Sequence, residues 1–463
     1  MVSFFYKLLV TALFLSPSLI WGQNQTELLS PVFSEKRLPF TLKIEVADFQ
    51  LPVGLQSYAT AIYRNQWILF AGRTNGLHGF APVGNNFPPL FQNRSVYLID
   101  PKTGRKWERS LKESDLSAEE IDLLSVTASQ FLQKGRTLYL LGGYGINSLT
   151  NEMGTKSTLT QIDLKKLVGW VKREEKGLKS AISVISHPNF QITGGFLYQL
   201  NDHSPFLLML GQNFIGDYRD DSNGIYAQQI RPFWVNAPQF APLCDNVKNK
   251  HPDYRRRDLN IVSVLLNDQF AYIAFAGVFT LQEGVWTVPI TIFPDGSSFE
   301  PDPNDPKTFK QAMNHYNCPT IQLYSVRKKE MFVVFPGGIS YGFFNNGNFE
   351  TDAEIPFINQ VTTIKIDKDQ QFTQHLMEGE YPYLVSQGTN PGNQLLFGAE
   401  AIFFPQTQVP LFSNGVIQLD KLPNKPTHIG YIVGGIMSTL PDTIAPHDTT
   451  ASPYIFKVTL IPK

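Results

Sequence analysis

One local pattern recurs six times along the chain: a short apolar run that ends in one or two glycines. The copy MFVVFPGG at residues 331–338 shows the pattern in full. The first glycines of successive copies lie 60 to 70 residues apart, and only the last step, of 97 residues, is longer. Repetition at a nearly fixed period predicts equivalent structural units packed against one another. The anchoring glycines are Gly72, Gly142, Gly211, Gly277, Gly337 and Gly434.

Each apolar run is the second half of a predicted hairpin. A strand rich in small residues precedes it, as in LQSYATAIY and LLSVTASQF, and a polar turn such as RNQ or QKGR joins the two. A third strand and often a fourth follow after a variable loop, so one unit holds about four antiparallel strands. Such sheets bury both faces when they pack around a common axis. The sequence therefore predicts an all-β fold, a six-bladed β-propeller of four-stranded antiparallel blades.

The glycines fit this fold as packing and turning positions. Glycine lets the backbone turn sharply at the end of the second strand and approach its neighbours closely. None of the copies is a GxGxxG motif that opens a helix, so we do not interpret them as phosphate-binding loops.

The composition favours many short strands and excludes one class of partner. Gly and Pro number 34 and 32, aromatic residues make up 13% and apolar residues 42% of the 463 residues, which suits a turn-rich chain with a large core. The net charge is −1, and the one basic cluster, RRR at 255–257, is flanked by Asp253 and Asp258. Nothing here resembles the basic surface of a nucleic-acid-binding protein.

The two ends of the repeat region predict how the ring closes. After Gly435 only 28 residues remain, enough for one more strand, YIFKVTLIPK, and not for a fourth. The segment FTLKIEVADFQLP precedes the first unit and lacks a hairpin partner. We therefore expect the N-terminal strand to supply the fourth strand of the last blade, which removes an open edge.

Residues 1–22 are interpreted as a signal peptide. Lys7 precedes the apolar stretch LLVTALFL, and a Ser-Pro-Ser segment ends it, as in exported proteins; a buried N-terminal helix is the alternative. Residues 23–39 would then be a leader segment and residues 40–463 a single propeller. The mature chain is expected to be secreted or periplasmic, monomeric, and without a transmembrane segment.

The chain has only two cysteines, Cys244 and Cys318. In an oxidising compartment they could pair as a disulfide, or they could remain two isolated buried thiols. The sequence leaves both alternatives open.

The repeat resembles the kelch-type β-propeller, a superfamily that includes the central domain of galactose oxidase. The first unit carries the apolar–glycine block and then the spaced Tyr97 and Trp107, and the second keeps Gly142, Gly143, Tyr144 and Trp170. The other units are degenerate, with Gln212 in place of a second glycine, for example. The resemblance covers roughly residues 40 to 463 and implies a propeller fold.

In a propeller, the loops that lead into the first strand of each blade meet at the central axis on one face. We call these the lead-in loops, and we expect a ligand to lie there. The candidate ligand-binding residues on these loops are Gln56, Gln191, Arg255, Arg257, Asp258, His315 and Tyr316. The loops after the second strands form a second set of candidates, with Arg73, His78, Tyr144 and Asn213.

The segment DYRRRD at 253–258 offers a clamp for an anionic group, because arginine pairs bidentately with carboxylates. Periplasmic sialic-acid mutarotases are kelch-type propellers that act on a carboxylated sugar, and the resemblance implies Arg257 as the carboxylate partner, with Asp258 or Glu400 as the acid. A solvated charge cluster that pairs with its own aspartates is the structural alternative.

Two other segments suggest metal chemistry. NHYNCP at 314–319 contains His315, Tyr316 and Cys318, which could bind a metal, as in the copper site of galactose oxidase, or could form a polar loop with a buried cysteine. GDYRDDSNG at 216–224 has the composition of a calcium loop without the EF-hand spacing, so a polar hairpin loop is its alternative. We predict neither a metal nor a cofactor.

The sequence favours an exported, non-catalytic binding or scaffolding propeller that recognises a protein or a glycan through the loops of one face. The alternatives are a sugar-directed enzyme resembling kelch-type mutarotases or epimerases, and a copper oxidase. Fold alone does not decide among these functions.

Overall fold

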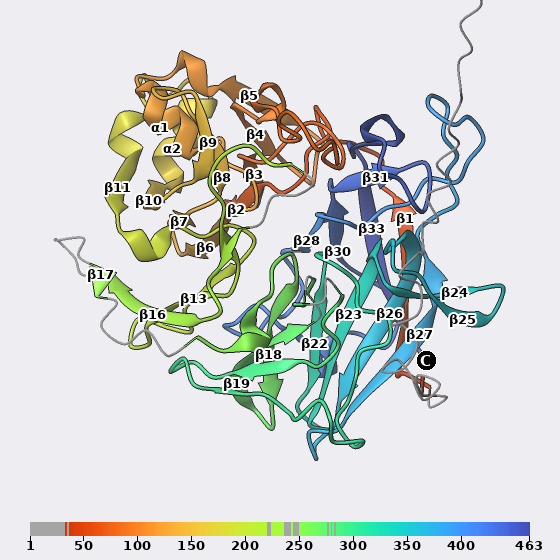
Figure 1. Cartoon of the computed structure of the whole chain (residues 1–463). Helices are drawn as coiled ribbons and strands as arrows, with labels where there is room; N and C mark the ends of the chain where they lie inside the picture. Colours follow the sequence, from red (N-terminus) through yellow and green to blue (C-terminus); the bar gives the residue numbers. More distant parts are fainter. Residues whose placement is uncertain are drawn as a thin grey trace, which may run out of the picture.

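The computed structural model describes residues 33–34, 37–219, 224–235, 242–243, 250–275, 277–278, 280–281 and 284–463. The predicted signal peptide and most of the leader lie outside these residues. In the described part of the chain, six antiparallel sheets follow one another around a central axis in sequence order (Figure 1). The predicted six-bladed β-propeller is therefore confirmed.

The first three blades each contain four strands among the described residues. Blade 1 consists of β2 (Ala59–Tyr63), β3 (Gln66–Phe70), β4 (Ser95–Ile99) and β5 (Lys106–Ser110). Blade 2 consists of β6 (Gln130–Lys134), β7 (Thr137–Leu141), β10 (Thr158–Asp163) and β11 (Ile182–Ser186). Blade 3 consists of β12 (Phe196–Tyr198), β13 (Phe206–Met209), β16 (Ile230–Val235) and β17 (Pro242–Leu243).

The last three blades follow the same order of strands. Blade 4 consists of β18 (Asn260–Leu266), β19 (Gln269–Phe275), β20 (Ile290–Ile292) and β21 (Ser298–Phe299). Blade 5 consists of β22 (Ile321–Ser325), β23 (Glu330–Ile339), β26 (Phe357–Ile366) and β27 (Phe372–Glu380), and β29 (Ile417–Gln418) pairs in parallel with β22. Blade 6 consists of β28 (Ile402–Pro405), β30 (Thr427–Val433), β33 (Ile455–Pro462) and β1 (Phe40–Val46).

The N-terminal strand completes the last blade, as the sequence predicts. β1 pairs antiparallel with β33, with Phe40 opposite Pro462 and Val46 opposite Phe456, and the two strands lie side by side in Figure 1. Joining the two ends of the chain in one sheet removes the seam at which a ring of blades would otherwise open.

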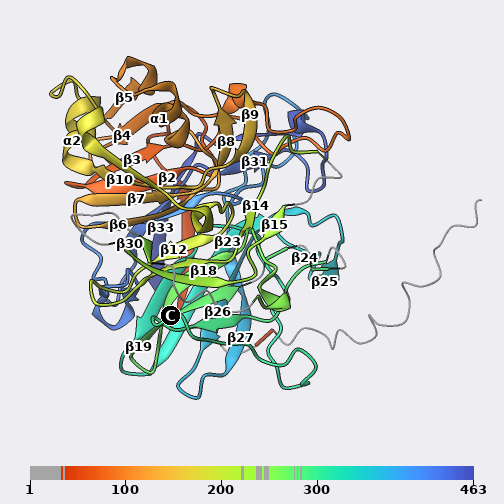
Figure 2. The ribbon, with the colours of Figure 1, turned by 60° about the vertical axis from the view of Figure 1, so that its left-hand side comes forward.

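Small hairpins extend the second and third strands of four blades beyond the glycines. Figure 2 shows them gathered on one face of the ring. They are β8 (Tyr144–Asn147) with β9 (Glu152–Thr155), β14 (Gln212–Asn213) with β15 (Ile225–Tyr226), β24 (Gly342–Asn345) with β25 (Asn348–Thr351), and β31 (Ile436–Ser438) with β32 (Thr449–Ala451).

Helical structure is minor in the described residues. The two α-helices are α1 (Ala118–Leu123) and α2 (Leu164–Val171), and the 3-10 turns are η1 (Pro89–Phe91), η2 (Leu111–Glu113), η3 (Lys179–Ala181), η4 (Pro188–Phe190), η5 (Pro252–Tyr254), η6 (Leu419–Lys421) and η7 (Pro446–Asp448). None of these helices has the length and apolar character needed to cross a membrane.

The apolar core lies between neighbouring blades rather than within one sheet. Ile68 and Phe70 of β3 pack with Leu138 and Leu140 of β7, and Trp170 of α2 closes the same cluster. All five side chains are at most 2% exposed. Because each apolar second strand is covered on both sides, burial of the six runs requires the complete ring.

The recurrent glycines bond each blade to the next. At five junctions in the described residues, a glycine N–H after the second strand donates to a backbone oxygen in the lead-in loop of the following blade. The bonds are Gly72 to Val126 at 2.7 Å, Gly143 to Ile192 at 2.9 Å, Gly211 to Arg256 at 3.0 Å, Gly338 to Phe397 at 2.8 Å and Gly435 to Leu55 at 2.9 Å.

The geometry at Gly142 explains why no other residue fits well there. Gly142 has φ of +61°, and a Cβ at this position would lie 2.0 Å from the backbone oxygen of Ile192. In blade 5 the strand does not end at the glycines: β23 continues through them with a bulge between Pro336 and Gly338. The diglycine is thus a bend that lets the following loop approach.

The long step between the last two repeats contains two insertions at opposite ends of the ring. Residues 381–401 follow β27 and run over the face of the small hairpins to β28. Residues 406–426 connect β28 to β30 at the other end, where Asn414 donates to the backbone oxygen of Val264 and β29 pairs with β22. The Pro-, Gly- and Asn-rich segments at residues 376–396 and 405–428 are typical of loops, and from the sequence we expect both to lie over one face. That expectation is wrong, because successive antiparallel strands alternate in direction.

Gly142→Ala is expected to destabilise the protein well beyond the usual cost of alanine at positive φ. The matched control is Gly135→Ala in the same blade, where φ is +54° and nothing lies within 4 Å of the added Cβ. Both variants carry the left-handed penalty of about 1–2 kcal/mol, and only Gly142→Ala also separates two blades. Denaturant unfolding measures both free energies, and equal losses would contradict this role.

Candidate ligand-binding site

The lead-in loops place one pair of residues from each blade around the axis. In the described residues, the second member of each pair has a positive φ and lies two to four positions before the first strand of its blade. This shared bend turns the chain from the face of the ring into the blade. The pairs are Gln56–Ser57, Thr127–Ala128, Thr193–Gly194, Arg257–Asp258, Tyr316–Asn317 and Ala399–Glu400.

Backbone hydrogen bonds join these pairs to one another. Ala128 N–H donates to the oxygen of Ser57 at 3.3 Å, and Gly194 N–H donates to the oxygen of Ala128 at 2.9 Å. The series continues from Asp258 to Gly194 at 3.3 Å, and Glu400 donates to Asn317 at 2.7 Å. We call these six residue pairs the inner ring. Their hydrogen bonds fix residues from distant parts of the sequence relative to one another.

A pocket of about 90 Å³ lies above this ring at the axis. The second strand of each hairpin ends beside the start of the first, so the loops after the second strands reach the same face. His78 and Tyr144 from that second set line the pocket; Gln212 does so in place of its neighbour Asn213. Arg73, from the same set, does not line the pocket and is only 1% exposed.

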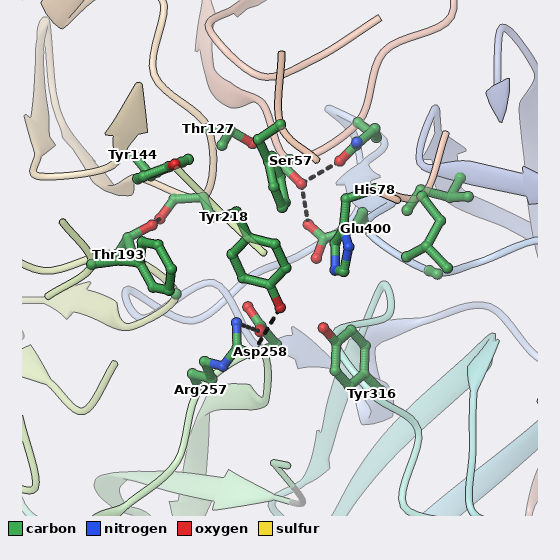
Figure 3. A pocket seen from close by; sticks show the side chains of 18 of the residues that line it. Ser57, His78, Thr127, Tyr144, Thr193, Tyr218, Arg257, Asp258, Tyr316 and Glu400 are labelled. Carbon is green, nitrogen blue, oxygen red and sulfur yellow. Dashed lines mark hydrogen bonds and ion pairs between the residues drawn. The ribbon is translucent and has the colours of Figure 1, made fainter. Parts of the chain in front are cut away.

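One side of the pocket carries its charged groups. Arg257 forms an ion pair with Asp258, with 3.2 Å between Nη1 and Oδ2. Its Nε donates to the Tyr226 hydroxyl at 3.0 Å, and its Nη2 donates to the Tyr218 hydroxyl at 3.5 Å. These contacts fix the guanidinium and neutralise its charge locally. Figure 3 shows the hydroxyl of Tyr316 pointing into the same space.

Glu400 lines the pocket, and its hydrogen-bond partners are neutral side chains. Its carboxylate accepts a hydrogen bond from Ser57 Oγ at 2.7 Å and another from Asn317 Nδ2 at 2.8 Å (Figure 3). Burial and the nearby charge of Asp258 raise the pKa of Glu400 to about 7, although both hydrogen bonds act to lower it. This carboxyl group can therefore gain or lose a proton near neutral pH.

Aromatic side chains form a second part of the pocket wall, the aromatic side. The ring centroids of His78 and Tyr218 lie 4.6 Å apart, those of Phe87 and Tyr218 5.0 Å, and those of Phe214 and Tyr218 5.2 Å. Tyr144 completes the group, 5.5 Å from Phe214. These rings come from the loops of blades 1, 2 and 3, and the N–H of Asn86 ties two of the loops together by donating to the oxygen of Tyr218 at 2.9 Å.

His78 is a neutral acceptor in this group. Its Nδ1 lies 2.8 Å from the backbone oxygen of Gly79, so Nδ1 carries the proton and Nε2 is left as the acceptor. Burial lowers the pKa of His78 to about 4, and the charges of Arg257 and Arg73 add to this effect.

Four of the seven predicted ligand-binding residues line the pocket: Gln56, Arg257, Asp258 and Tyr316. The other three belong to the same loops and do not line it. Arg255 donates to the backbone oxygen of Thr280 at 3.2 Å, and Gln191 donates to that of Thr155 at 3.2 Å.

His315 is fully buried below the pocket. Its Nδ1 lies 2.8 Å from the oxygen of Gly337, and its Nε2 lies 2.8 Å from Oγ1 of Thr362. Cys318 is also buried, with Asn260 Nδ2 at 3.8 Å from its sulfur, and burial raises the pKa of this thiol. Cys244 lies outside the described residues, so a disulfide and two isolated thiols both stay open as alternatives.

Sequence reasoning missed Phe87, Phe214 and Tyr218 on the aromatic side of the pocket. Tyr218 belongs to GDYRDDSNG, the segment with the composition of a calcium loop, of which residues 220–223 lie outside the described residues. Its aromatic neighbours are spread over three blades, and their spacing carries no signal. Among the described residues, no group of three or more His, Cys, Asp or Glu side chains is placed to hold a metal ion.

Comparison with known proteins finds similarity in structure and none in sequence. No protein-family model and no curated protein matches the sequence. A solved structure titled "Structure of YjhT" is similar over 87% of this chain and 98% of that chain, at 10% identity and a TM-score of 0.45. The chain is a six-bladed β-propeller with a pocket at its axis.

Glu400→Gln is expected to stabilise the protein more at pH 8 than at pH 5. The fold raises the pKa of this carboxyl from 4.5 to about 7. The folded chain thus retains a proton that the unfolded chain releases, and stability falls as the pH rises through this window. The gain at pH 8 is at most about 3 kcal/mol.

Denaturant unfolding at the two pH values measures this gain. The control is Glu152→Gln at an exposed position on β9, which should show no such dependence on pH. A gain for Glu400→Gln that is the same at both pH values would contradict the assignment of a destabilising charge to this carboxyl.

Proposed function

We propose that this protein is an exported, kelch-type binding propeller that takes one sugar unit of a glycan in its axial pocket, without catalysis. The observation that carries the proposal is that polar side chains and aromatic rings line the same pocket. Sugar rings have apolar C–H faces that pack on aromatic rings and hydroxyls that need polar partners. A concave site with a few fixed polar groups suits such a ligand.

The size of the pocket favours a glycan over a broad protein interface. At about 10–15 Å³ for each water, a pocket of about 90 Å³ holds several water molecules. That is room for a ligand about the size of one sugar ring and not for a folded surface. The backbone bonds of the inner ring hold the polar side chains in place before the ligand arrives, which reduces the entropy cost of binding.

Tyr316→Phe is expected to weaken sugar binding about threefold to tenfold, because it removes one pocket hydroxyl worth about 0.5–1.5 kcal/mol. Thermal denaturation against a panel of neutral sugars, amino sugars, sugar acids and divalent metals identifies the ligand, since saturation at 100 times Kd stabilises by about 2.7 kcal/mol. Calorimetric titration then gives Kd for each variant.

The matched control for that titration is Tyr383→Phe, at a tyrosine that is 72% exposed. It should bind as the unmodified protein does. No stabilisation by any sugar of the panel, or equal binding by both variants, would contradict a glycan site at the axis.

A sugar-directed enzyme is the second candidate. Glu400 and Asp258 lie in one pocket beside Arg257, and a carboxyl with a pKa of about 7 suits general acid–base catalysis at neutral pH. A mutarotase needs a group of this kind to move a proton between the ring oxygen and the anomeric hydroxyl.

Under this candidate, the protein should accelerate the exchange between α and β anomers of a bound sugar, and Glu400→Gln should abolish the acceleration while the sugar still binds. Magnetisation-transfer NMR on the sugar measures the exchange rate directly. An exchange rate equal to that in buffer would leave binding as the only function of the pocket.

A further inference from the structure

One acid that lines the axial pocket has no ion-pair partner among the described residues. Among the described residues that line it, Asp258 and Glu400 are acids and Arg257 is the base. Arg257 forms an ion pair with Asp258, with 3.2 Å between Nη1 and Oδ2. The printed partners of Glu400 are the neutral Ser57 and Asn317. One carboxylate thus faces the pocket with no cation from the described residues at ion-pair distance, and such a charge is costly away from water.

Two side chains of the pocket, Glu400 and His78, offer acceptor atoms to a ligand. A carboxylate can accept about four hydrogen bonds, and Glu400 accepts two. His78 presents Nε2 as an acceptor because its Nδ1 is used by Gly79. The donors of Arg257 are directed at Asp258, Tyr226 and Tyr218. A ligand that supplies donors satisfies this set, whereas a ligand carboxylate meets unpaired negative charge.

The aromatic side chains of the pocket also favour a ligand with a positive charge. The faces of Tyr and Phe rings carry negative potential and attract cations within about 6 Å. Phe214 and Tyr218 line the pocket with ring centroids 5.2 Å apart. The ring of Phe87 already has the guanidinium of Arg73 over it, 4.9 Å from its centroid. An ammonium group that reaches both the carboxylate of Glu400 and the ring of Tyr218 or Phe214 would be stabilised by both.

We propose that the ligand of this pocket carries a free ammonium group, so that the bound unit is an amino sugar with an unacylated nitrogen, paired with the carboxylate of Glu400. The inference rests on the proposed glycan-binding function and names its substrate class. It also distinguishes the site from one for a carboxylated sugar, for which Arg257 would have to leave Asp258.

Calorimetric titration of three matched pairs tests the proposal: glucosamine with glucose, galactosamine with galactose, and mannosamine with mannose. In at least one pair the amine should bind at least tenfold more tightly. Glu400→Gln should remove the preference while the neutral sugar still binds, and Glu152→Gln, on the exposed face of β9, should retain it. N-acetylated forms, which lack the positive charge, should bind as the neutral sugars do.

The outcomes separate this inference from the proposed function. Equal or tighter binding of neutral sugars or of glucuronate would overturn the ammonium assignment and leave a glycan site. Binding of tetramethylammonium or methylammonium that depends on Glu400, without binding of any sugar, would support the assignment and overturn the glycan. If calcium chloride alone binds in a Glu400-dependent way and displaces the amine, or if neither sugars nor amines bind, the inference is wrong.

Discussion

The hydrogen bond from a glycine N–H of one blade to a lead-in loop of the next is the contact on which the rest of this structure depends. It recurs at five junctions of the described chain, at 2.7 to 3.0 Å. Each bond requires a backbone bend that only glycine adopts without strain, together with space that a Cβ would fill. Because the acceptor lies in the loop that continues to the axis, the same contact sets the angle between blades and the position of the pocket residues.

At the junction of blades 4 and 5 a side chain makes the corresponding contact. The backbone oxygen of His315 accepts from Asn260 Nδ2 at 2.6 Å, in the position where Leu55, Val126 and Ile192 accept from glycines. The Asn260 side-chain oxygen also accepts from the N–H of Cys318 at 3.1 Å. An asparagine thus fixes the loop that carries Tyr316 to the pocket, which accounts for the polar character of NHYNCP without a metal.

The positions within the lead-in loop explain how far the sequence predicted the site. The residue two places before the bend faces the core: Leu55, Val126, Ile192, Arg256 and His315 are all at most 1% exposed. The next residue and the bend residue face the pocket, as Arg257 and Asp258 do. Periodicity located the repeats and the closure by β1, because burial of alternating apolar residues leaves a pattern in the sequence. Periodicity does not show which residues of a loop face the pocket, so the sequence predicts Arg255 and His315 as ligand-binding residues together with Arg257 and Tyr316. The aromatic side depends on contacts between loops of three blades, which no local pattern records.

We propose that recognition takes place at the axis, beside Glu400 and Tyr218. A crystal structure of the protein grown with glucosamine tests this most directly. We expect one sugar unit in the axial pocket, with its nitrogen at hydrogen-bond distance from Glu400 and a ring face against the aromatic side chains. A sugar bound on the outer edge of a blade, with the axial pocket holding only water, would contradict it.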